Sequence, residues 1–98
     1  MQIEYNGKTL ELKSMSRSAV QAFKGEEHRI EEMQDPEEKA AARDALQEKA
    51  VRLSFGDEAL ELFSDSARDF TLAFNAALLF SHGFNEAAVL DAFKGSVK

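Results

Sequence analysis

The first thirteen residues alternate between polar and apolar positions, and this period of two is typical of a β-strand. Asn6-Gly7 interrupts the alternation, and it is the dipeptide that a type I′ turn prefers, because both central residues need a positive φ. A two-residue turn fixes the pairing, so that Ile3 faces Leu10 and Glu4 and Thr9 point to the polar side. The sequence therefore predicts a β-hairpin over 1–13 that buries one apolar face, formed by Met1, Ile3, Tyr5, Leu10 and Leu12.

From residue 14 onward the apolar positions follow a helical period. Ser14 or Ser16 can cap a first helix, and Gly25 inside it leaves open one bent helix or two short ones. Asp35-Pro36 is a strong signal for the start of the next helix, which we expect to run to about Leu53. Its expected apolar stripe is narrow and mostly alanine, and consists of Ala42, Ala45, Leu46, Ala50 and Leu53.

The C-terminal part of the chain has a different composition. Seven of the eight phenylalanines follow residue 54, whereas 15 of the 30 residues in 24–53 are charged. The pattern predicts a short helix over 57–63 and a central helix over 66–82 that Gly83 ends. A last helix should begin after Asn85 and end at Gly95.

These elements predict an α+β, mostly α fold, in which an N-terminal β-hairpin is followed by four to five helices. With 98 residues the chain is expected to form a single domain. Within it we distinguish a β-hairpin (1–13), a charged helical arm (14–53) and a Phe-rich helical core (54–98).

Charge and composition exclude several partners. A net charge of −6 argues against binding to nucleic acid, and the basic residues are scattered among acids, as in the expected i,i+4 pair Glu48–Arg52. The longest apolar run, 70–80, is too short to span a membrane, and the N-terminus does not resemble a secretory signal. We therefore expect no nucleic acid, no membrane contact and a cytoplasmic location.

Candidate catalytic groups are few. His82 follows Ser81 directly, but neighbours on a helix point about 100° apart and cannot form a dyad. His28 lies in a polar run, and Asn75 is the one polar side chain well inside the apolar run, where a buried structural hydrogen bond is expected. No zinc, calcium or phosphate motif is present, so we expect no enzyme activity, no cofactor and no metal.

The expected central helix is apolar nearly all round, and a small domain can cover only part of it. We therefore expect a protein partner or self-association into a homo-oligomer through the C-terminal half, with the charged arm outside. The residues expected to carry this contact are Phe63, Phe70, Phe74, Leu78, Phe80, Phe84 and Phe93.

The hairpin segment, Ile3-Glu4-Tyr5-Asn6-Gly7-Lys8-Thr9-Leu10-Glu11-Leu12, followed by an acidic helical remainder, resembles the small tail assembly chaperones of long-tailed bacteriophages. The resemblance implies a non-enzymatic chaperone that oligomerises on apolar helices of a tape measure protein in the host cytoplasm. Two alternatives stay open on the residues alone. They are a bacterial helical adaptor or regulatory protein that binds one folded partner, and a small enzyme or ligand-binding domain with a pocket between the C-terminal helices.

Overall fold

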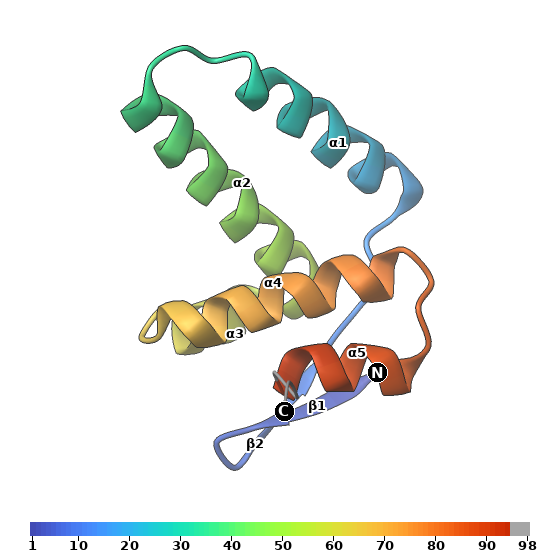
Figure 1. Ribbon diagram of the computed structural model, residues 1–98. Helices are drawn as coiled ribbons and strands as arrows, with labels where there is room; N and C mark the ends of the chain where they lie inside the picture. Colours follow the sequence, from blue (N-terminus) through green and yellow to red (C-terminus); the bar gives the residue numbers. More distant parts are fainter. Residues whose placement is uncertain (95–98) are drawn as a thin grey trace.

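A computed structural model describes residues 1–94 and contains a two-stranded antiparallel hairpin followed by five helices (Figure 1). The elements are β1 (Gln2–Tyr5), β2 (Lys8–Glu11), α1 (Arg17–Glu31), α2 (Pro36–Phe55), α3 (Asp57–Phe63), α4 (Ala67–Ser81) and α5 (Glu86–Lys94). The predicted α+β, mostly α class is confirmed. The expected end of the last helix at Gly95 lies outside the described residues.

The hairpin has the register that its turn requires. Ile3 pairs with Leu10 and Glu4 pairs with Thr9. Both turn residues have a positive φ, 50° at Asn6 and 81° at Gly7, as a type I′ turn demands. Ile3 is buried, whereas Glu4 and Thr9 are exposed, so the predicted inward face is confirmed.

The helix ends follow local sequence signals. The Ser16 and Ser66 side chains accept hydrogen bonds from backbone amides in the first turns of α1 and α4, and Asp35 does the same for α2. Gly83, at φ 89°, ends α4 in a Schellman motif, in which the amide of Phe84 donates to the carbonyl of Leu79. Gly25 does not interrupt α1, which is one continuous helix.

The larger of two apolar clusters lies where the hairpin meets α3, α4 and α5. It contains an aromatic group in which Phe63, at zero exposure, makes edge contacts with Tyr5, Phe55 and Phe93, at ring centroid distances of 5.0, 5.1 and 5.8 Å. Tyr5 and Phe93 also meet, at 6.1 Å. We call the hairpin, α3, α4 and α5 the body of the molecule.

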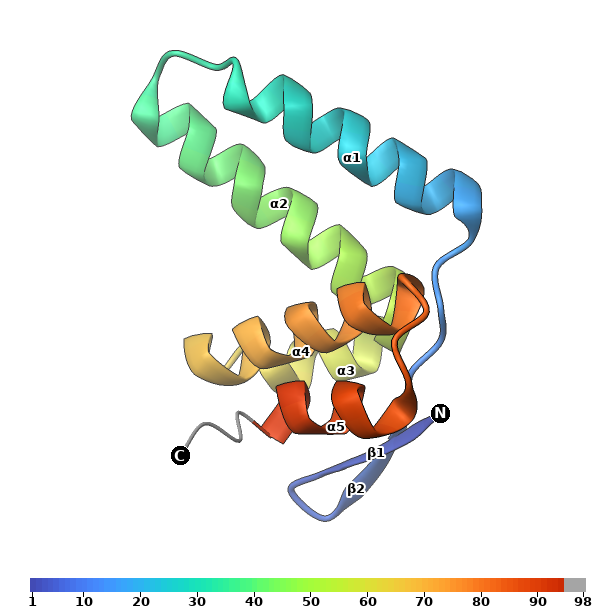
Figure 2. The same cartoon turned by 45° about the vertical axis from the view of Figure 1, so that its right-hand side comes forward.

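The smaller cluster lies between α1, α2 and one side of α4. Its buried members are Met15, Phe23, Ile30, Leu46 and Ala50, and Phe74 of α4 packs against them. The rings of Phe23 and Phe74 are 5.9 Å apart. We call α1 and α2 the arm. Figure 2 shows that the arm projects from one side of α4, whereas the hairpin lies at the opposite end of the molecule, beneath α5.

The expected apolar stripe of α2 is partly wrong. Leu53 is 50% exposed, whereas Val51 and Ser54 are buried. The reason is that α2 packs on two clusters with two faces: Leu46 and Ala50 contact the arm cluster, whereas Val51 joins the body cluster. A single stripe with helical period cannot describe a helix with two buried faces.

Two further expectations about polar residues are wrong. Asn75 is exposed rather than buried, because it lies with Thr71 on a narrow polar stripe of α4. Arg52 does not pair with Glu48; its guanidinium lies 2.9 Å from a carboxylate oxygen of Asp57, across the junction of α2 and α3.

Candidate functional site

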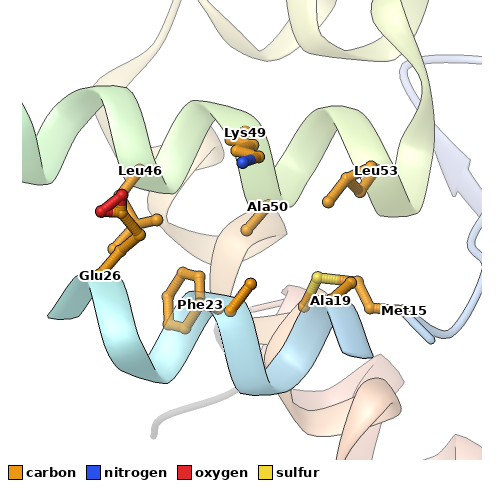
Figure 3. Close-up of a pocket in the computed structure, with 9 residues that line it drawn as sticks. Met15, Ala19, Phe23, Glu26, Leu46, Lys49, Ala50 and Leu53 are labelled. Atoms are coloured by element: carbon orange, nitrogen blue, oxygen red, sulfur yellow. The ribbon is translucent and has the colours of Figure 1, made fainter. Parts of the chain in front are cut away.

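An apolar groove runs between α1 and α2 on the side where no α4 residue contributes to the lining. Its inner part, next to Met15 and Leu53, is a hollow of about 140 Å³. Figure 3 shows Phe23 and Ala19 of α1, with Met15 just before that helix, facing Leu46, Ala50 and Leu53 of α2. The full lining of this hollow is Met15, Ala19, Ala22, Phe23, Glu26, Leu46, Lys49, Ala50 and Leu53.

A second hollow of about 270 Å³ continues the groove toward the outer end of the arm. It is lined in part by Ile30 and Ala45, and it shares Glu26, Leu46 and Lys49 with the first. The groove therefore extends along most of both helices.

The groove exists because alanine occupies five of its thirteen lining positions, namely Ala19, Ala22, Ala42, Ala45 and Ala50. Phe23, Leu46 and Ala50 are buried and form the floor, whereas Ala22 and Ala45 are exposed on the flanks. A methyl group is too small to close the space between two helices whose axes lie about 8–10 Å apart. Leu53, at 50% exposure, stands at the inner end of the groove as a large apolar side chain in water.

Charged groups of both signs border the groove. Glu26 accepts hydrogen bonds from the guanidinium of Arg29 one turn later, with a distance of 3.0 Å from Nε. Lys49 lies on the opposite helix and lines the same two hollows as Glu26. Among residues 1–94 the Lys49 ammonium makes neither a hydrogen bond nor an ion pair.

The residues that the sequence nominated for protein contact do not form one surface. Phe63 and Phe93 are buried in the body, at 0% and 8% exposure. Four others are half-buried: Phe70 and Phe80 pack against the body cluster, Leu78 packs against the arm cluster, and Phe74 packs against both. Phe84 alone in the set is largely exposed, at 51%.

The candidate catalytic residues are dispersed. His28 is exposed on α1 and His82 is exposed just after α4, where its Nδ1 lies 2.7 Å from the carbonyl oxygen of Leu78. The Ser81 hydroxyl accepts a hydrogen bond of 2.9 Å from the Met15 amide, and so holds the segment before α1 against α4. Within the described part of the chain, no group of three histidine or acidic side chains could hold a metal, and no helix could cross a membrane.

One titratable side chain links the hairpin to α4. The Tyr5 hydroxyl donates a hydrogen bond of 2.6 Å to Oδ2 of Asp69. This bond to a carboxylate, together with partial burial, raises the pKa of Tyr5 above its usual 10.0. The pair holds the hairpin against α4.

Sequence reasoning missed the groove, although one signal for it was visible. The narrow, alanine-rich stripe of α2 indicates a helix that approaches its neighbour closely without filling the space on either side. Comparison of the chain with protein-family models, with curated proteins and with solved structures finds no match. Function must therefore be argued from the groove itself.

Proposed function

We propose that this protein is a non-enzymatic assembly protein that acts by binding other protein chains, or its own, through the groove of the arm. The observation that supports it is the apolar groove between α1 and α2, with Leu53 exposed at its inner end. Amphipathic helices bind in grooves of this kind, with apolar side chains spaced i, i+3, i+4 and i+7. The 15 residues of α1 correspond to a groove of about 22 Å, which accommodates a helix of about four turns.

The resemblance to small phage tail assembly chaperones adds a finer proposal. In that case the client is an apolar helix of a tape measure protein, and the encoding gene lies between the tail tube and tape measure genes. A different gene neighbourhood would remove the phage part of the proposal and leave the groove as a protein-binding site. An adaptor for one folded partner differs in stoichiometry, because it forms a fixed 1:1 complex.

Binding of a synthetic probe tests the groove directly. The probe is a fluorescent, uncharged amphipathic helix of about four turns with leucines at i, i+3, i+4 and i+7, and the measurement is fluorescence anisotropy at low protein concentration. We expect a micromolar Kd that Ala45→Arg weakens by about tenfold or more, because arginine fills the groove and places a charge in it. The absence of peptide binding to the wild type, together with a strictly monomeric protein, would overturn the proposal.

The matched control is Ala40→Arg. Ala40 and Ala45 are exposed alanines of the same helix, but Ala40 is five residues away and lies about 140° around the helix from Ala45. We expect the Ala40→Arg variant to bind the peptide as the wild type does. Equal losses in both variants would show that binding depends on the net charge of the arm and not on the groove.

A further inference from the structure

The structure narrows the identity of the partner, an inference that rests on the proposed function. We propose that the groove is occupied by the arm of a second copy of this chain, so that two arms form a four-helix bundle. The two-fold axis runs along the groove, and it places α1 of each copy over α2 of the other. Because α1 and α2 are antiparallel (Figure 2), every facing pair across this interface is also antiparallel.

Shape supports a self-complementary contact. Each copy carries a knob, Leu53 at 50% exposure, and a hollow of about 140 Å³ lined by Ala19, Ala22 and Ala50. An engineered apolar cavity of about 150 Å³ is large enough to hold benzene, so this hollow is large enough for one leucine side chain. Rotation about the groove carries Leu53 over the α1 side of the partner's groove, where Ala19 and Ala22 lie. Two identical surfaces that each supply a knob and a hole satisfy the requirement of a two-fold interface.

Charge also favours the arm over the other surfaces as the place where two copies associate. The α1 helix carries three basic and three acidic residues, and α2 carries four of each, so the net charge of −6 lies entirely outside these two helices. Two copies that met through α3 would instead bring together Asp57, Glu58 and Glu61 from each chain. The arm is therefore the surface where an acidic protein associates with itself at the lowest electrostatic cost.

Charged residues at the border of the groove can form two equivalent ion pairs across the proposed interface. Glu26 on α1 and Lys49 on α2 line the same hollows, so they lie at the same height along the arm. The proposed rotation places Lys49 of each copy over Glu26 of the other, which gives the Lys49 ammonium an acidic partner. Each copy contributes both members, so the two pairs form or fail together.

The C-terminal half is a weaker candidate for self-association than the sequence suggested. The body covers much of α4, and its large apolar side chains from Phe70 to Phe80 are half-buried. In the described part of the chain only Leu53 and Phe84 are large apolar residues with half their surface exposed. These two positions give a matched pair of variants, one in the proposed interface and one outside it.

Sedimentation equilibrium over a concentration series tests the proposal. We expect the wild type to dimerise and Leu53→Asp to raise the dimer Kd by about thirtyfold or more, as loss of a hot-spot apolar contact does. Phe84→Asp should leave the Kd unchanged, and circular dichroism checks that both variants are folded. Dimers broken by Phe84→Asp and not by Leu53→Asp would overturn the proposal.

Charge reversal gives a second, independent readout. Lys49→Glu should raise the dimer Kd by about tenfold, because it brings two carboxylates together, and the double variant with Glu26→Lys should restore the wild-type Kd. A double variant that is no better than the single one would reject the proposed orientation. A wild type that stays monomeric but binds the synthetic helix would overturn this inference and leave the proposed function standing. A wild type that stays monomeric and does not bind the synthetic helix would overturn both this inference and the proposed function.

Discussion

The arm and the body both bury apolar surface, but they do so with different side chains. In the body, Phe63, Tyr5 and Phe93, joined by Phe55 from the end of α2, fill the space between the hairpin and the helices. In the arm, alanines bring two helices together without filling the space beside them, and a groove remains. The residues that carry most of the packing are therefore not those best placed to meet a partner.

The sharpest test of the difference is to remove one phenylalanine from each region. Phe63→Ala should cost about 3–5 kcal/mol, because Phe63 is fully buried and in contact with three other rings. Phe23→Ala should cost about 3 kcal/mol, at the low end of the same range, because Phe23 already borders an open hollow. Urea unfolding of both variants measures the difference. An equal or larger loss from Phe23→Ala would contradict the view that the body dominates stability.

Replacement of one glycine in each region by alanine should change the stability of the protein in opposite directions. Gly83, at φ 89°, ends α4, so Gly83→Ala should cost about 1–2 kcal/mol. Gly25 lies within α1 with open space around it, so Gly25→Ala should stabilise the protein by about 0.5–1 kcal/mol. Thermal unfolding reports both changes. Destabilisation by Gly25→Ala would contradict the open space found around this glycine.

Local signals predicted more of the fold than of the site. The Asn6-Gly7 turn and the Asp35 cap depend on residues close in sequence, so they could be read directly. The groove could not, because it depends on where α1 lies relative to α2. The exposure of Leu53 likewise depends on the second buried face of α2. Pattern reasoning treats each helix as having one buried face, and it fails where a helix joins two clusters.

The smallest expected effect concerns the bond between the hairpin and α4. Removal of the Tyr5 hydroxyl in Tyr5→Phe should cost about 0.5–1.5 kcal/mol at neutral pH, because Asp69 loses its donor. The pKa of Tyr5 is raised in the folded state, so the folded protein holds this proton more tightly than the unfolded chain does. The stability advantage of the wild type over Tyr5→Phe is therefore fully present below pH 10 and is lost as the pH rises through the higher pKa.

Urea unfolding of the wild type and of Tyr5→Phe between pH 8 and about 11 measures this advantage directly, because other titrating groups contribute equally to both proteins. A difference that stays constant across the series would show that the hydroxyl stabilises the fold by packing alone. The arm is expected to be unaffected, since Tyr5 and Asp69 both belong to the body.

The contact between Tyr5 and Phe93 has a consequence for how the chain is made. A ribosome releases the hairpin first and α5 after all the other helices described, so the rings of Tyr5 and Phe93 cannot meet until α5 has emerged. The arm joins residues that are close in sequence and can assemble as soon as α2 leaves the exit tunnel. During synthesis the groove can therefore form on a nascent chain whose hairpin does not yet pack against α5.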